Sequence, residues 1–80
     1  MSNIADEIKS SISESLKIRI EKVTESARFS EDLGVDSLDV IELMVDLEQK
    51  HGVKIPDEDA KKLITVGDTI EYIENKTNSK

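Results

Sequence analysis

Residues 34–48 of the chain read GVDSLDVIELMVDLE, a glycine followed by a capping aspartate and an uninterrupted helical pattern. Asp36 is a residue type favoured at a helix N-cap, and Asp39 suits the first turn of a helix. Gly52 follows the pattern and can end the helix in the left-handed conformation. This stretch therefore predicts one well-defined helix between Asp36 and Gly52.

On a helical wheel, this predicted helix has three faces. One broad face is expected to contact the core and carries Val40, Leu43, Met44, Leu47 and His51. An acidic ridge opposite it carries Asp39, Glu42 and Asp46. A second apolar strip lies between them and carries Leu38, Ile41 and Val45. Because a helix packed on one side does not need this strip, the strip either widens the core contact or binds a partner.

Three other segments have helical signals. The first has apolar residues at four-residue spacing, Ile4, Ile8, Ile12 and Leu16, and predicts a helix over residues 3–16. Pro56 opens a short helical turn through residue 62, and Thr65 can cap a last helix over about 66–75. That last helix is expected to bury Val66, Ile70 and Ile73, and the polar residues 75–80 are expected to fray.

Residues 17–35 are predicted to form a long structured loop. The alternation at 16–20 resembles a strand, but its only evident partner is 53–55, and an isolated pair of short strands is marginal in water. The loop is expected to be anchored by Ile18, Ile20, Val23, Phe29 and Leu33. The sequence thus predicts an all-α fold, a small helical bundle with three main helices, one short helix and a long structured loop between helices one and two.

Length and charge limit the domain count and the partners. Eighty residues, 36% of them hydrophobic, predict a single domain over 1–80, near the lower size at which one core suffices. A net charge of −7, with Phe29 and Tyr72 as the only aromatic residues, argues against nucleic acid and favours a basic protein surface as partner. Strong like charge also favours a monomer.

The sequence has no signal for export or for a membrane. It contains no cysteine, and no apolar run approaches a signal peptide or the roughly 20 residues of a membrane span. The acidic residues also lack the spacing of a calcium-binding loop, and one histidine alone is a poor metal site. We therefore expect a cytoplasmic protein with no membrane span and no metal.

Ser37 is the residue of the central stretch whose chemistry needs an explanation. A serine nucleophile needs an adjacent base, and the only histidine, His51, lies about 21 Å along the same predicted helix at about 1.5 Å per residue. We therefore expect no catalytic residue and no enzyme activity. The residues alone leave three possibilities for Ser37: an inert helix start, a phosphorylation site, or a site that another enzyme modifies.

Several short motifs between residues 31 and 73 occur together in one known family, and the match to that family extends from Ile4 to Ile73. They are EDLGVDSLD at 31–39, IEL at 41–43, LE at 47–48, IPDEDA at 55–60, TV at 65–66 and YI at 72–73. On these motifs the chain resembles the acyl carrier proteins of dissociated fatty acid synthesis. His51 departs from the pattern, because the family usually has phenylalanine there.

The resemblance implies a role for Ser37 and for the helix that it begins. Ser37 would accept the 4'-phosphopantetheine arm of coenzyme A from a separate phosphopantetheinyl transferase, and the arm would hold acyl groups as thioesters during fatty acid biosynthesis. Fatty acid synthesis enzymes would use basic surfaces of their own to bind this chain. The residues that they would contact are Asp36, Leu38, Asp39, Ile41, Glu42, Val45, Asp46 and Glu48.

The resemblance also implies that a growing acyl chain retracts among the helices. Candidate lining residues are Ile8, Phe29, Leu47, Ile55, Leu63 and Ile70. Each of the six, taken alone, is more simply explained as an ordinary core residue. Two other functions also remain open: a carrier for polyketide or nonribosomal peptide assembly, and a small acidic adaptor whose apolar strip binds another helix.

Overall fold

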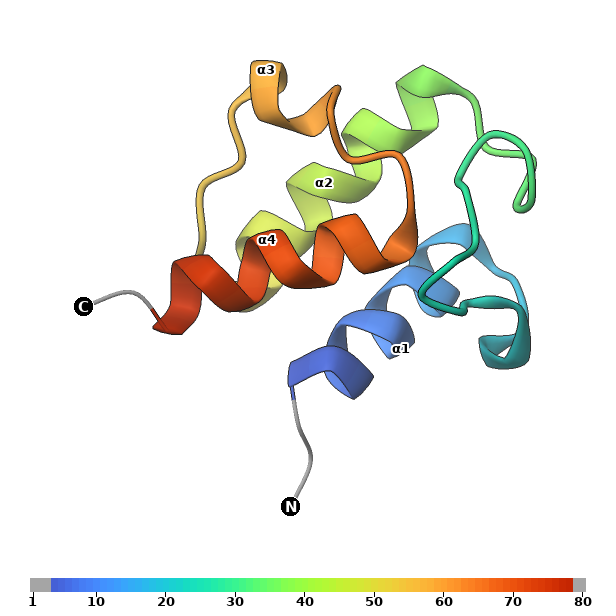
Figure 1. Cartoon of the computed structure of the whole chain (residues 1–80), viewed down its shortest axis with the longest axis horizontal. Coiled ribbons are helices and arrows are strands. Elements are labelled where there is room, and N and C mark those ends of the chain that lie inside the picture. Colours follow the sequence, from blue (N-terminus) through green and yellow to red (C-terminus); the bar gives the residue numbers. More distant parts are fainter. Residues whose placement is uncertain (1–3, 79–80) are drawn as a thin grey trace.

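The computed structural model describes residues 4–78, and this part of the chain is helical with no β-strand. Its elements are α1 (Ile4–Leu16), the 3-10 helix η1 (Ile20–Lys22), α2 (Ser37–His51), α3 (Asp57–Ala60) and α4 (Val66–Asn78) (Figure 1). The predicted all-α bundle, with three main helices, one short helix and a long loop after the first, is confirmed.

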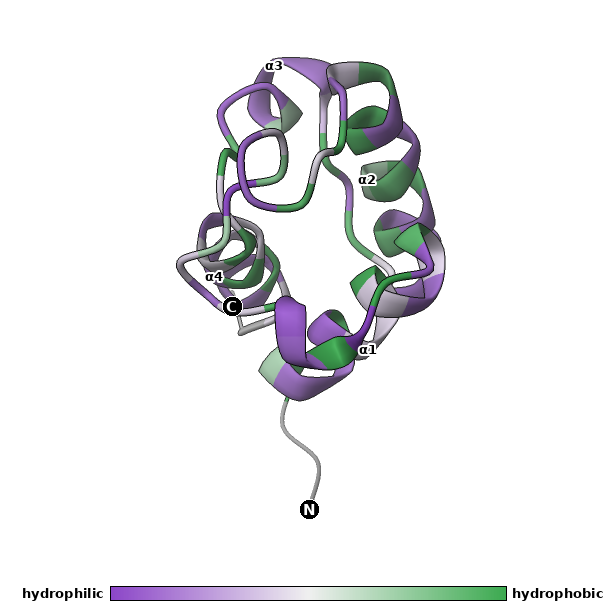
Figure 2. Ribbon diagram, turned by 90° about the vertical axis from the view of Figure 1, so that its right-hand side faces the viewer, coloured by the Kyte–Doolittle hydropathy of each residue, from purple (hydrophilic) through white to green (hydrophobic). Residues whose placement is uncertain are grey.

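The helices pack around one aliphatic core. α1 contacts both α2 and α4, and α3 packs against α2. Figure 2 shows α1, α2 and α4 around a shared interior, with apolar stretches of α2 turned inward. The fully buried large side chains come from all three helices: Ile8, Ile12, Leu43, Met44, Leu47, Val66, Thr69 and Ile73. Phe29, from the long loop, is the one aromatic residue buried in this core.

The predicted core face of α2 is buried at its centre and only half-buried at its ends. Leu43, Met44 and Leu47 are buried, whereas Val40 and His51 are half-buried. The Nε2 atom of His51 is itself buried and has no hydrogen-bond partner among the described residues. His51 is therefore a half-buried residue at the end of this face, with one buried ring nitrogen that its surroundings do not satisfy.

The long loop is held in place by backbone hydrogen bonds to the connection between α3 and α4. The Phe29 N–H donates to the Ile64 carbonyl at 3.0 Å, and the Val66 N–H donates to the Ala27 carbonyl at 2.9 Å. The Gly67 N–H donates to the Glu25 carbonyl at 2.8 Å. These bonds satisfy buried backbone groups without forming a sheet.

One predicted loop anchor is wrong. Ile20 is 46% exposed, whereas Val23 and Phe29 are buried and Ile18 and Leu33 are partly buried against the core. Ile20 begins η1, and the Val23 N–H closes this tight turn on the Ile20 carbonyl. This turn buries Val23 and leaves Ile20 at the surface.

Helix α4 continues beyond its predicted end near residue 75, to Asn78. The Lys76 Nζ lies 5.4 Å from the centre of the Tyr72 ring, and the Thr77 hydroxyl donates to the Glu74 carbonyl at 3.1 Å. Both contacts lie at helical spacing and support the last turn. Residues 79–80 of the predicted tail lie outside the described residues, as does residue 3 of the first predicted helix.

Candidate functional site

Ser37 is the first residue of α2, and the residue before it caps the helix. Asp36 has an extended backbone, and its Oδ1 accepts a hydrogen bond from the Asp39 N–H at 2.9 Å. This arrangement satisfies one of the free N–H groups at the helix start. Ser37 is exposed, and its hydroxyl makes no hydrogen bond within residues 4–78. The capped helix thus presents an unpaired serine hydroxyl to the solvent.

The turn before the cap fixes where α2 begins. Gly34 has a φ of 66°, which is easy only for glycine, although an added Cβ would meet no atom within 4 Å. Val35 is buried, and its N–H donates to the Phe29 carbonyl at 2.8 Å. The left-handed glycine lets Val35 enter the core while the next two residues turn outward.

Ser37 lies on the rim of a cavity of about 290 Å³ that has mainly apolar walls. The walls come from the long loop, the first turns of α2, and α3 with the segment after it. The lining residues are Phe29, Ser30, Val35, Ser37, Val40, Ile41, Ala60, Lys61, Leu63 and Ile64. An exposed hydroxyl beside an apolar hollow can anchor a flexible group whose far end enters the hollow.

This geometry suits attachment and offers nothing for nucleophilic catalysis. Ser37 and His51 are the first and last residues of the 15-residue helix α2, so the only imidazole in the chain is far from the hydroxyl. The hydroxyl of Ser37 is open to an enzyme that would modify it, and the neighbouring cavity is apolar. These residues fit a covalently attached phosphopantetheine group, which needs an accessible oxygen and an apolar surface for its cargo.

The acidic ridge of α2 faces the solvent. Asp36, Asp39, Glu42 and Asp46 are exposed, and Glu48 is half-buried. Three of the five already accept hydrogen bonds within the chain, and Asp36 does so as the cap of α2. The Ser15 hydroxyl donates to Asp46 at 3.1 Å, and Glu48 accepts a hydrogen bond from the Ile55 N–H at 2.6 Å. Asp39 and Glu42 are the members whose side chains make no hydrogen bond or ion pair in the described part of the chain.

The second apolar strip of α2 divides between two environments. Leu38 is 67% exposed and Val45 is 44% exposed. Ile41 is half-buried and lines the cavity beside Ser37. The strip therefore combines two exposed aliphatic residues with one that belongs to the cavity wall.

All six predicted acyl-lining residues are buried, but only two line the cavity beside Ser37. Phe29 and Leu63 line it. The other four belong to the same core without reaching this cavity: Ile8, Leu47, Ile55 and Ile70.

Several cavity residues were missed by the sequence reasoning. Val40 and Ile41 follow Ser37 by three and four positions, so helical spacing alone could have placed them beside it. Ala60, Lys61 and Ile64 come from a distant segment. Only the path of the chain brings them to Ser37, and no local pattern signals that.

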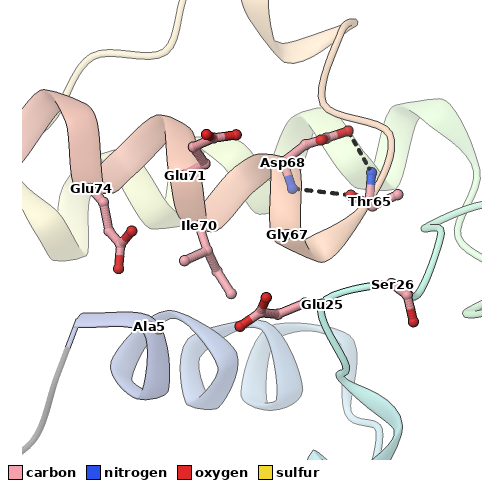
Figure 3. A pocket seen from close by; sticks show the side chains of 9 residues that line it. All are labelled: Ala5, Glu25, Ser26, Thr65, Gly67, Asp68, Ile70, Glu71 and Glu74. Atoms are coloured by element: carbon pink, nitrogen blue, oxygen red, sulfur yellow. Dashed lines mark hydrogen bonds between the residues drawn. The ribbon is translucent and has the colours of Figure 1, made fainter.

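A second, larger hollow of about 560 Å³ lies between α1, α4 and the long loop (Figure 3). Its lining includes four carboxylates, those of Glu25, Asp68, Glu71 and Glu74. Figure 3 also shows the cap of α4, where the Asp68 N–H donates to the Thr65 hydroxyl at 3.0 Å and the Thr65 N–H donates to Asp68 at 3.2 Å. Within residues 4–78, no group of three or more acidic, histidine or cysteine side chains could hold a metal ion.

Two further observations concern the length of the helices and the charge at the start of α2. Across the described range, none is long and apolar enough to cross a membrane. The start of α2 is bordered by exposed carboxylates.

Comparison with known proteins identifies the family. A family model described as the phosphopantetheine attachment site matches residues 6–73. The acyl carrier protein of Wolinella succinogenes is 52% identical over 71 residues, which cover 89% of this chain and 93% of that protein. Acyl carrier proteins from two strains of Helicobacter pylori are 50% and 51% identical over 70 residues, 88% of this chain and 90% of each relative. The chain therefore belongs to the acyl carrier proteins, which are carriers rather than enzymes and use phosphopantetheine as their cofactor.

Proposed function

We propose that Ser37 is the residue that bears phosphopantetheine, and that the chain carries acyl intermediates of fatty acid synthesis in the cytoplasm. One observation carries the assignment of Ser37. Its hydroxyl is exposed, unpaired within the described residues and placed at the rim of an apolar cavity. His51, the only histidine of the sequence, lies at the other end of α2, so Ser37 has no imidazole beside it, which agrees with modification by a separate transferase.

In this proposal, the Ser37 Oγ provides the ester oxygen that joins the protein to the phosphate of the arm. The bound group supplies the thiol that this chain lacks, since the sequence contains no cysteine. The start of α2 contributes free N–H groups and the positive end of the helix dipole, both of which favour a phosphate. The protein itself contributes position and accessibility, and the reactions of the acyl group belong to the enzymes that it visits.

The cavity beside Ser37 is the proposed entrance for the acyl chain. Phe29 and Leu63 line it, and both belong to a core cluster that also contains Leu47 and Ile55. The buried residues of this cluster are aliphatic apart from Phe29 and Met44, and the flexible thioether side chain of Met44 can adjust to admit a chain. We propose that the acyl group moves from the cavity toward Ile8, Leu47, Ile55 and Ile70 as it grows.

The proposed partners are the phosphopantetheinyl transferase and fatty acid synthesis enzymes with basic surfaces. The exposed acids at the start of α2 would attract such surfaces over a distance and orient them at Ser37. Leu38 and Val45 would then provide apolar contact beside the charges. The acidic character of α2 supports fatty acid synthesis enzymes as the partners.

Charge reversal on α2 tests this part of the proposal. We expect Asp39→Lys and Glu42→Lys, each in the form loaded with phosphopantetheine, to lower kcat/KM for malonyl loading by a malonyl transferase by about tenfold or more. The matched control is Glu21→Lys, an equal charge change at an exposed residue in η1. We expect the control to change the rate less than about twofold, since only long-range charge differs. Melting curves should stay close to wild type, because all three side chains are exposed.

Other outcomes would identify a different function. Equal loss in the control and in the α2 variants would reject docking on α2. A loaded protein that fatty acid enzymes ignore, but that polyketide or nonribosomal peptide enzymes accept, would favour carriage in those assemblies. A protein that accepts no arm and binds a partner helix through Leu38 and Val45 would be an adaptor.

A further inference from the structure

The cavity beside Ser37 contains one positively charged residue. Lys61 follows α3 directly and is exposed, and it lines the same cavity as Ser37. The other lining residues are apolar or carry hydroxyl groups. Lys61 is therefore the only cation that this cavity brings to the site.

An anion attached to Ser37 would lie among negative charges. Asp36 and Asp39 flank Ser37 in the sequence and are exposed, and Glu42 follows on the same helix. A phosphodiester adds one negative charge to a chain whose net charge is already −7. Like charges at such short range repel one another, so a nearby cation would lower the cost of holding the phosphate there.

Lys61 is available for this role. Asp57 and Glu58 precede it by four and three positions, the spacing at which helical ion pairs form. The ion pairs found within residues 4–78 nevertheless join Lys9 to Glu25, Arg28 to Glu31 and Lys50 to Glu14, and Lys61 takes part in none. Its flexible four-carbon side chain carries a compact charge that suits a phosphate oxygen.

We propose that Lys61 pairs with the phosphodiester of the arm on Ser37 and holds the first part of the arm over the cavity. This inference rests on the proposed attachment at Ser37 and adds a second contact to it. The pair would bridge α2 and the end of α3, two of the segments that line the cavity. It would keep the arm near the apolar entrance while the thiol end remains free to reach partner enzymes.

The chain offers a matched control in the next residue. Lys62 is also exposed and carries the same charge, but it lines a different hollow, together with Asp68, Glu71 and Tyr72. Replacing either lysine by alanine changes the net charge equally. A difference between the two variants that appears only in the loaded form therefore reports a contact specific to the Ser37 cavity.

The test compares apo and loaded forms of the wild type, Lys61→Ala and Lys62→Ala, with intact mass to confirm one arm on each loaded protein. We expect Lys61→Ala to displace the phosphorus NMR resonance of the arm from its wild-type position. Salt of about 1 M, where the Debye length is about 3 Å, should remove most of this difference. Lys62→Ala should give the wild-type resonance at both salt concentrations.

Thermal melting gives a second readout that does not depend on any partner enzyme. We expect the Tm of the loaded form minus that of the apo form to be lower in Lys61→Ala than in wild type by about 1 to 5 °C. Lys62→Ala should leave this difference unchanged. Subtracting the apo form removes any effect of the substitution on the fold itself.

Equal effects of the two lysine substitutions, or no effect of either on the resonance and on the Tm difference, would overturn the role of Lys61. Attachment at Ser37 would still stand in that case, because the mass increase reports it separately. If the wild type gains no mass, the attachment proposal fails and takes the Lys61 contact with it.

Discussion

Tyr72 shows how one side chain connects α3 to α4. Its hydroxyl donates to the Asp59 carboxylate at 2.6 Å. Burial, followed by this hydrogen bond and by the negative charge of Asp59, raises the pKa of Tyr72 from 10.0 to about 12. Since α3 is a short helix that forms part of the wall beside Ser37, this contact helps to hold the wall in place.

The raised pKa makes stability depend on pH in the alkaline range. The folded chain keeps the phenol proton more tightly than the unfolded chain, so the stabilisation is complete below pH 10.0 and is lost as the pH rises toward about 12. We expect the Tm of the wild type to fall more steeply across this range than that of Tyr72→Phe.

The ultraviolet absorbance of tyrosinate measures this pKa directly, because Tyr72 is the only tyrosine. Asp59→Asn is the control, and it should bring the pKa of Tyr72 down toward 10.0. Titration of the folded wild type near pH 10.0 would contradict the hydrogen bond and its effect.

His51 and Lys61 mark what could and could not be predicted at the scale of single residues. The wheel placed His51 on the core face, and the structure leaves its Nε2 buried without a partner in the described range. Lys61 carried no such signal, because it lies on a different segment from Ser37 and meets it only through the fold. Periodicity assigns a residue to a face, but contacts between distant segments depend on tertiary packing.

At the scale of elements, the cap of α2 determines how Ser37 is presented. We expect Asp36→Ala to destabilise the protein by about 1 kcal/mol, because the Asp39 N–H then loses its acceptor. Such a loss would lower the Tm of a domain of this size by roughly 4 to 8 °C. Urea denaturation followed by circular dichroism measures the change.

Asp36→Asn provides the control, since asparagine caps helices about as well as aspartate but carries no charge. It should retain most of the stability. If both substitutions destabilise the protein equally, the charge of Asp36 and not the cap would be responsible.

The elements differed in how well the sequence predicted them. Both ends of α2 were predicted because local signals coincide there, an aspartate cap and the left-handed Gly52 with a φ of 66°. The exposure of Ile20 in η1 and the last turn of α4 were missed. A three-residue turn has too little periodicity to detect, and α4 continues through contacts of its own polar side chains, such as Lys76 over the Tyr72 ring.

At the scale of the whole molecule, the net charge of −7 opposes the stability that the small aliphatic core provides. Self-repulsion of exposed carboxylates destabilises a compact state. We expect millimolar Mg²⁺ to raise the Tm by several degrees, and sodium chloride at matched ionic strength to raise it less. Identical melting curves in the two salts would contradict a specific relief of repulsion by the divalent ion.

The architecture as a whole followed from helical periodicity and from the resemblance to acyl carrier proteins. The cavity beside Ser37 did not, because it is bounded by four segments whose meeting no local pattern encodes: the long loop, α2, α3 and the residues before α4. Four of the six predicted lining residues proved to be buried outside that cavity. Burial could be predicted from sequence, whereas which buried residue faces which hollow could not.

Intact-mass measurement after incubation with coenzyme A and a phosphopantetheinyl transferase tests the role of Ser37 most directly. We expect the wild type to gain the mass of one phosphopantetheinyl group, peptide fragmentation to place it on Ser37, and Ser37→Ala to gain nothing. The contradicting result is no gain by the wild type under conditions that load a known acyl carrier protein, or a gain of the same mass by Ser37→Ala.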